Sequence, residues 1–181
     1  MDYKIFKIIN QLAGRYSILD MLMILVSNKV RYLFAFVLMS MWFRGHSYRK
    51  VIRYALISAA FTLLIDMLIQ CFYFKPRPFI KHRVGILIPS KMNSAFLSKH
   101  TLLATAVATS IFLRERVLGS VMWGMSLLTG VSRIWVGHHY PSDIVRSLFI
   151  GSLTSIIVEK VFGSLKIMNR KSKKYYAQIR K

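Results

Sequence analysis

Residues 51–74, VIRYALISAAFTLLIDMLIQCFYF, decide the fold class of this 181-residue chain. The segment is almost entirely apolar and, at about 1.5 Å per residue, is long enough as a helix to cross the hydrocarbon core of a bilayer. Backbone groups in lipid must satisfy their hydrogen bonds internally, and a helix does so within a single segment. The stretch therefore predicts a membrane-spanning helix.

Similar apolar segments occur on both sides of this one. They cover residues 30–43, 98–113, 117–135 and 143–162. Segment 17–27 is too short to cross alone, so it forms either a half-helix or an extension of the next span. Residues 3–13 mix apolar and polar side chains, which predicts an amphipathic helix at the membrane interface. We therefore expect an all-α fold, an integral-membrane bundle of about five to six membrane helices with an amphipathic N-terminal helix.

The chain is long enough for one domain and shows no repeats or linkers. We expect a single membrane domain in which residues 1–16 form the interfacial helix and residues 17–163 form the bundle. Residues 166–181 form a basic cytoplasmic tail. No cleavable signal peptide is recognisable, because no small-residue cleavage site follows the first apolar residues.

Composition excludes several other classes of protein. Apolar residues make up 55% of the chain, and its formal net charge is +21. The basic residues separate apolar segments instead of covering one soluble face, so this charge does not indicate nucleic-acid binding. The single cysteine, Cys71, excludes an internal disulfide and a cysteine-ligated zinc site.

The basic residues also orient the predicted bundle. With residues 44–50 in the cytoplasm, three clusters of basic residues lie on the inner side, in agreement with the positive-inside rule. These groups are Arg44, Arg49, Lys50 and Arg53, then Arg114 and Arg116, then the eight basic residues from Lys160 to Lys181. The long outer loop breaks the rule with Lys75, Arg77, Lys81, Arg83 and Lys91. An anionic ligand explains this outer cluster, and lipid headgroups are the alternative for its last three members.

Three polar clusters lie at the outer ends of the predicted spans: FKPRPF (74–79), LSKHT (97–101) and SRIWVGHHYPSD (132–143). They supply the cations Lys75, Arg77, Lys99 and Arg133. Ser98 is a good N-cap, and the free amides at a helix start favour an anion. Arginine side chains suit phosphate oxygens because they donate two parallel hydrogen bonds. We therefore expect a phosphate group to bind where the three clusters meet, at the membrane surface.

The few carboxylates limit the chemistry of this site. The chain has six, and only Asp143 falls within the clusters. A phosphatase that depends on Mg²⁺ or two metals needs several oxygen ligands, so we expect neither a metal nor another cofactor. A histidine held by a carboxylate can attack phosphorus while a second histidine protonates the leaving oxygen. His139 lies four residues before Asp143, and His100 is available as the acid.

These motifs resemble a known family. SRIWVGHHYPSD fits the SR-x5-H-x3-D signature of the type 2 phosphatidic acid phosphatase superfamily, and SKH and RP resemble parts of its other two motifs. KPRPF, SKHT and SRIWVGHHYPSD together resemble the bacterial undecaprenyl-diphosphatases of the BcrC type. The resemblance implies His139 as nucleophile, Asp143 as its orienting partner, His100 as general acid, and Arg77, Ser98 and Arg133 as ligands of the phosphoryl oxygens. It also implies hydrolysis of undecaprenyl diphosphate on the outer leaflet of the plasma membrane, which supports peptidoglycan synthesis and opposes bacitracin.

The chain departs from the family pattern at three positions. Gln70 stands where the first motif has its lysine, and Leu97 replaces the proline of the second motif. Lys99 replaces a small or acidic residue, and its charge lies beside the positive end of a helix dipole, which requires compensation. We expect Lys75 to substitute for the missing lysine. Our hypothesis for Lys99 is that it contacts the second phosphate of a diphosphate or partly replaces that lysine.

Two alternative functions remain open from the sequence. One is hydrolysis of another lipid phosphate, such as phosphatidic acid or phosphatidylglycerophosphate. The other is a small transporter or non-catalytic membrane subunit that carries a vestigial site. Two neighbouring polar residues are expected to be structural: His138 packs within its loop or caps it, and Asp66 pairs with a neighbouring helix.

Overall fold

The computed structural model describes residues 2–82, 84–89 and 94–179, and the side chains of these residues apart from residue 47 and residues 165–179. Over this part the protein is all-α, which confirms the predicted fold class. The helices are α1 (Asp2–Asn10), α2 (Ser17–Phe43), α3 (His46–Phe72), α4 (Pro78–Lys81), α5 (Lys99–Phe112), α6 (Arg116–Trp135) and α7 (Pro141–Ile179).

Three of the described helices are long and apolar enough to cross a membrane. They are α2, α3 from Tyr48 to Phe72, and α6. The helices that correspond to the other two predicted spans, α5 and α7, are not among these three, and α5 has only 14 residues. The short helix α4 was not predicted; it begins with Pro78, whose fixed φ angle suits the first position of a helix.

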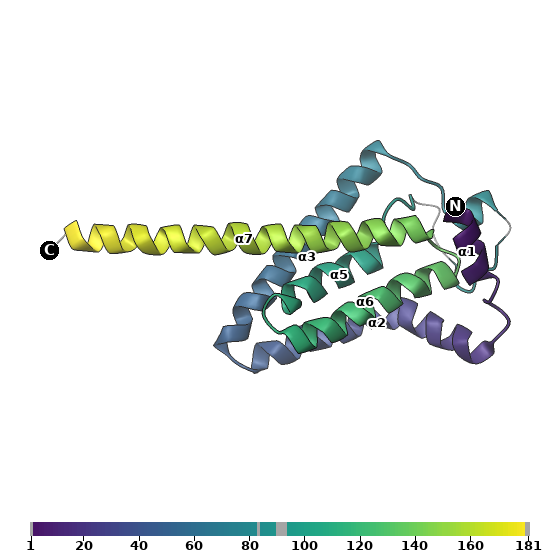
Figure 1. Ribbon diagram of the computed structural model, residues 1–181, viewed down its shortest axis with the longest axis horizontal. Coiled ribbons are helices and arrows are strands. Elements are labelled where there is room, and N and C mark those ends of the chain that lie inside the picture. The colour runs from purple at the N-terminus through teal and green to yellow at the C-terminus, as the bar shows by residue number, and fades with distance from the viewer. Residues whose placement is uncertain (1, 83, 90–93, 180–181) are drawn as a thin grey trace.

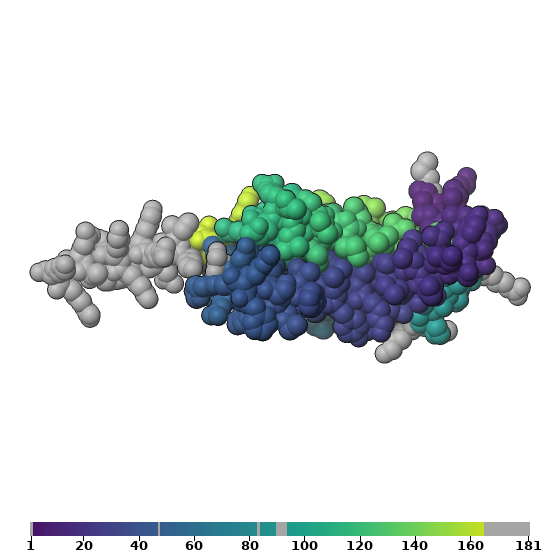
Figure 2. Space-filling model, turned by 90° about the horizontal axis from the view of Figure 1, so that it is seen from below, coloured from purple at the N-terminus to yellow at the C-terminus, as the bar shows by residue number. Residues whose placement is uncertain are grey.

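Segment 17–27 extends the next span and is not a separate half-helix. Helix α2 runs without a break through 27 residues, which corresponds to about 40 Å. It lies along α6 on one face of the molecule, with α1 at one end of the pair (Figure 2). Two buried hydrogen bonds join α2 to α6: Arg133 donates to Ser27 Oγ, and Trp135 Nε1 donates to Asp20 Oδ1.

Helix α5 occupies the centre of the bundle and packs against α3, α6 and α7 (Figure 1). Its sequence, KHTLLATAVATSIF, is rich in small residues, which allow helix backbones to approach one another closely in membrane proteins. Gly151 of α7 shows how close this approach is, because a Cβ atom there would lie 2.8 Å from the carbonyl oxygen of Leu102. The hydroxyl of Ser155 also donates to the carbonyl of Ala106 across this contact.

One end of the bundle gathers α1, the loop after α3, the start of α5 and the turn between α6 and α7 (Figure 1). Asn10 of α1 connects three of these parts. Its side-chain amide donates to the carbonyls of Gly85 and Trp135, and its side-chain oxygen accepts from the Gly85 amide. Phe6 is fully buried on the same side, beside Tyr140. The three polar clusters of the sequence all lie at this end.

Candidate active site

The turn between α6 and α7 presents two adjacent histidines and depends on a glycine. Gly137 has a φ angle of +86°, which favours glycine, and a Cβ atom there would lie 2.6 Å from the carbonyl oxygen of Gly85. The amides of His138 and His139 then both donate to the carbonyl of Arg133. The turn therefore fixes both imidazoles directly beyond the end of α6.

The predicted His139–Asp143 pair is brought together in the structure. His139 Nδ1 lies 3.8 Å from Asp143 Oδ2, and both side chains are buried. This separation is longer than a hydrogen bond, and Oδ2 accepts one at 2.8 Å from the Tyr140 amide instead. The carboxylate therefore stabilises the turn and faces Nδ1 of the imidazole, which leaves Nε2 as the nitrogen directed away from it.

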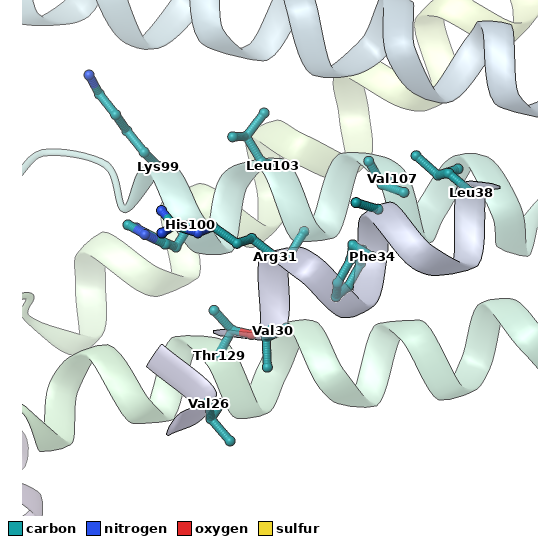
Figure 3. A pocket seen from close by; sticks show the side chains of 12 residues that line it. Val26, Val30, Arg31, Phe34, Leu38, Lys99, His100, Leu103, Val107 and Thr129 are labelled. Carbon is teal, nitrogen blue, oxygen red and sulfur yellow. The ribbon is translucent and has the colours of Figure 1, made fainter. Parts of the chain in front are cut away.

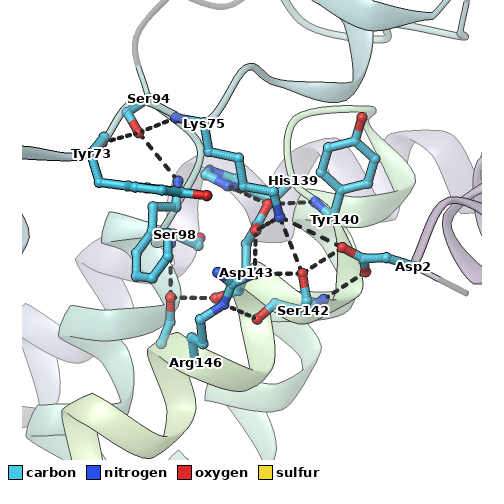
Figure 4. Close-up of polar contacts among 12 residues, drawn as sticks. Asp2, Tyr73, Lys75, Ser94, Ser98, His139, Tyr140, Ser142, Asp143 and Arg146 are labelled. Carbon is cyan, nitrogen blue, oxygen red and sulfur yellow. Dashed lines mark hydrogen bonds and ion pairs between the residues drawn. The ribbon is translucent and has the colours of Figure 1, made fainter. Parts of the chain in front are cut away.

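Lys75 forms an ion pair with Asp143 (Figure 4). Its ammonium group also donates to Ser142 Oγ at 3.2 Å, lies 3.6 Å from Asp2 Oδ2, and stands over the ring of Tyr140. The sequence predicted Lys75 as a phosphate ligand that replaces the family lysine. The structure instead pairs its ammonium group with Asp143, the carboxylate that faces the candidate nucleophile His139.

Two further residues of this network were missed by the sequence. Arg146 Nη2 donates to Ser142 Oγ at 2.7 Å and lies 3.3 Å from Asp143 Oδ1. Its position one helical turn after Asp143 was a usable signal. Asp2 accepts hydrogen bonds from the amide and hydroxyl of Ser142, at the start of α7. Asp2 lies 140 residues before Ser142, so no local pattern indicated this contact.

The two arginines predicted to bind phosphate, Arg77 and Arg133, are both buried at the site. Their positive charges lower the pKa of His139, and both arginines also lie close enough to His100 for their charges to act on it. Arg133 donates to Ser27 through one guanidinium nitrogen, whereas its Nε is buried without a hydrogen-bond partner among the described residues. This N–H group is available to donate to an anion, and buried polar groups are almost always paired.

Burial and positive charge keep the histidines of the turn neutral. Burial lowers the pKa of His139 to about 4; contact with Asp143 opposes this change, and the charges of Arg133 and Arg77 add to it. Burial also lowers the pKa of His138 to about 3. At neutral pH the His139 imidazole therefore retains the lone pair that a nucleophile requires.

His138 and Ser98 have structural contacts. His138 Nε2 lies 2.7 Å from the carbonyl oxygen of Ile88 and so holds the loop after α4, in agreement with its predicted packing role. Ser98 is the N-cap residue of α5, as predicted, but its hydroxyl makes no capping hydrogen bond. It accepts one from Thr101 instead, and the Ser98 amide donates to Ser147 Oγ of α7.

Lys99 pairs with Asp66 of α3, which confirms the expected structural pairing of that carboxylate. The ammonium group lies 3.5 Å from Asp66 Oδ2, which also accepts a 2.6 Å hydrogen bond from Gln70. Lys99 therefore lies beside the position where the family has its lysine, with its charge compensated by a buried carboxylate. The structure does not show Lys99 directed at the histidines.

The described residues offer no evident metal site, since no three of their histidine, cysteine, aspartate and glutamate side chains form a cluster that could hold an ion. Lys81 is exposed at the end of α4. Two other basic residues predicted for the outer loop, Arg83 and Lys91, lie outside the described residues.

Comparison with known proteins identifies the family of the chain. Residues 50–165 match the PAP2 superfamily. The chain is 39% identical to the undecaprenyl-diphosphatase BcrC of Bacillus subtilis, over 87% of this chain and 82% of that protein. It is 28% identical to the bacitracin transport permease protein BcrC of Bacillus licheniformis, over 84% of this chain and 76% of that protein.

Solved structures share the fold. LpxE of Aquifex aeolicus superposes with a TM-score of 0.75 at 24% identity, covering 88% of this chain and 94% of that one. A transmembrane PAP2-type phosphatidylglycerolphosphate phosphatase from Bacillus subtilis superposes with a TM-score of 0.67 at 15% identity, covering 90% of this chain and 86% of that one. The family match covers more than half of the chain and includes all three polar clusters. The chain therefore belongs to the PAP2 superfamily and is a membrane phosphatase of that family.

Proposed function

We propose that this protein hydrolyses undecaprenyl diphosphate to undecaprenyl phosphate and inorganic phosphate at the outer face of the plasma membrane. The observation that carries the proposal is the buried His139–Asp143 pair within range of two buried arginines, Arg77 and Arg133. The choice of lipid is supported by the 39% identity to a protein named as an undecaprenyl-diphosphatase.

In the first step, His139 Nε2 attacks the terminal phosphorus atom, and the bond from phosphorus to the bridging oxygen breaks. The anionic diphosphate favours the protonated form of His100, which donates a proton to that oxygen as undecaprenyl phosphate leaves. Arg77 and Arg133 stabilise the charge on the transferred phosphoryl group. Ser98 lies at the start of α5, where helix amides add to this stabilisation. Asp143 stabilises the positive charge that develops on the imidazole.

In the second step, a water molecule attacks the phosphohistidine. His100, now neutral, accepts the proton of that water, the bond from phosphorus to His139 breaks, and inorganic phosphate is released. Protein cations supply the electrostatic stabilisation in this scheme, and Lys75 and Lys99 act through the carboxylates that they hold. The proposed reaction requires no divalent metal.

The proposal includes a membrane arrangement. Residues 1–16 lie at the outer interface, residues 17–163 form the bundle, and residues 166–181 form a cytoplasmic tail. Helices α5 and α7 enter the membrane together with the three long apolar helices, which makes five membrane helices, the lower end of the predicted range of five to six. The site then opens to the outer leaflet, where a lipid diphosphate reaches it from the membrane.

Phosphate release by detergent-purified protein tests the proposal. The substrates are undecaprenyl diphosphate, phosphatidic acid and phosphatidylglycerophosphate, each with and without EDTA. We expect undecaprenyl diphosphate to have the highest kcat/KM, EDTA to have little effect, and His139→Ala to abolish turnover. Preference for another lipid would reassign the substrate. Inhibition by EDTA that Mg²⁺ reverses would refute the mechanism, and inactivity on every lipid would indicate a vestigial site.

A further inference from the structure

An apolar groove begins at the candidate general acid. It encloses about 320 Å³ between α2, α5 and α6. Its walls are formed mainly by Val26, Val30, Phe34, Leu38, Leu103 and Val107. One end is polar, because Arg31, Lys99 and His100 also line the groove (Figure 3). An amphipathic ligand, anionic at one end and apolar beyond it, matches this distribution.

The two cations at this end point in different directions. The Arg31 side chain extends from α2 toward His100, whereas the Lys99 side chain points away from both (Figure 3). The ammonium group of Lys99 is already paired with Asp66. Arg31 is therefore the cation at this end of the groove whose side chain approaches the general acid.

Arg31 lies deep within a helix that is apolar enough to span a membrane. It is the fifteenth residue of α2, about 21 Å along the axis from Ser17. A charge at such a depth is costly and usually serves a function, with an anionic partner. Within the described part of the chain, Arg31 contacts the hydroxyl and ring of Tyr32 and forms no ion pair with a carboxylate.

The proposed reaction places an anion near Arg31. His100 protonates the bridging oxygen of the diphosphate, so the phosphate that stays on the lipid must lie next to His100 on the side away from His139. The lipid chain continues from that phosphate. The groove that begins at His100 provides an apolar path for the chain, and Arg31 stands where the retained phosphate enters it.

We infer that Arg31 binds the phosphate retained on the lipid, with the first part of the prenyl chain in the groove between α2, α5 and α6, and so selects diphosphates over monophosphates. This inference rests on the proposed function. A monophosphate substrate presents its one phosphate to His139 and has only an ester oxygen at His100, so it gains little from Arg31. The reaction product carries its phosphate at the Arg31 position and is therefore held by the same contact.

Arg31→Gln tests this assignment, with Lys29→Gln as the matched control. Lys29 is an exposed cation on the same helix that does not line the groove, so its loss changes the charge of α2 equally. The substrates are geranylgeranyl diphosphate and geranylgeranyl phosphate in the same detergent. We expect Arg31→Gln to lower kcat/KM for the diphosphate by about 10- to 100-fold, as for loss of a charged hydrogen bond. The monophosphate should change by less than about threefold, and product inhibition by geranylgeranyl phosphate should weaken.

Two results separate failure of this inference from failure of the proposed function. If the wild-type protein hydrolyses the diphosphate but Arg31→Gln affects both substrates equally, or no more than Lys29→Gln does, Arg31 does not bind the retained phosphate. If the wild-type protein does not hydrolyse prenyl diphosphates, the proposed function fails, and the role of Arg31 fails with it.

A chemical rescue distinguishes the charge from a structural effect of the side chain. Arg31→Cys is made in a Cys71→Ser background, because Cys71 is the single native cysteine and is exposed. Modification with an aminoethyl methanethiosulfonate reagent restores a positive charge, whereas the methyl reagent adds none. We expect the aminoethyl group, and not the methyl group, to restore diphosphate turnover. Equal responses to the two reagents would overturn the inference, even if Arg31→Gln does not fold.

Discussion

Replacing Lys99 with glutamine removes the ammonium group that lies 3.5 Å from Asp66 Oδ2 and joins α5 to α3. The Asp66 side chain is 2% exposed and that of Lys99 is 50% exposed. Loss of one partner from a fully buried pair costs about 3–5 kcal/mol, whereas an exposed pair contributes about 0–1 kcal/mol. Because one partner is half exposed and Gln70 still donates to Asp66, we expect Lys99→Gln to lower the free energy of unfolding by about 1–2 kcal/mol.

Thermal unfolding in detergent measures this effect. A loss of about 1–2 kcal/mol corresponds to a decrease in Tm of about 2–8 °C for a chain of this size. Lys81→Gln is the control, because Lys81 is exposed and forms no ion pair within the described residues. We also expect Asp66→Asn to remove most of the effect of Lys99→Gln, since the two substitutions disrupt the same contact.

Kinetics provide the result that would refute this reasoning. If Lys99 acts through Asp66, Lys99→Gln changes kcat/KM for lipid diphosphates and monophosphates by the same factor. An unchanged Tm together with a selective loss of diphosphate turnover would instead place Lys99 on the second phosphate of the substrate, which is the role that its position in the sequence predicts.

Three other predictions concern the site and its orientation. Histidine NMR of the free protein should show His139 titrating near pH 4, well below the ordinary pKa of about 6.5. The unfolded chain then binds this proton more readily, so the free energy of unfolding decreases as the pH falls from about 6.5 to 4. A midpoint above about pH 6 would contradict the buried environment of His139. Gly137→Ala should lower the free energy of unfolding by about 1–3 kcal/mol, because its positive φ angle and the nearby loop carbonyl disfavour a side chain; an unchanged Tm would contradict this. In a Cys71→Ser background, an impermeant thiol reagent applied to whole cells should label Lys81→Cys and not Ser164→Cys, and the reverse pattern would invert the proposed orientation.

The sequence was sufficient for the fold class and for the grouping of the candidate site. Long apolar segments predict membrane helices, because a helix satisfies its backbone hydrogen bonds within lipid. Polar clusters at the same ends of successive spans then come together when those spans pack against one another. His139, Asp143, Arg77 and Arg133 were found in this way. The separation of four residues between His139 and Asp143 also predicted their proximity directly, because it places both side chains in one turn.

The partners of the lysines could not be predicted from the sequence. Lys75 and Lys99 were both expected to face phosphate, but each is paired with a carboxylate. Their pairing depends on how α3 is rotated against α5 and on how the loop after α3 crosses the start of α7, and tertiary packing sets both. Arg31 was missed because α2 contributes no residue to the three polar clusters, although it closes one side of the groove beside His100.

The hydrogen bonds of Asn10 have a consequence for biosynthesis. Helix α1 leaves the ribosome before the other described helices, and the groups that its Asn10 contacts lie 75 and 125 residues later in the chain. Contacts this distant in sequence form late, because the intervening segments must be in place before the chain can close on itself. Docking of α1 therefore has to wait until the end of α6 has emerged. The Asp2 contacts with the start of α7 wait longer still, so a partly inserted chain lacks the network behind His139. Completion of this network is therefore coupled to completion of insertion.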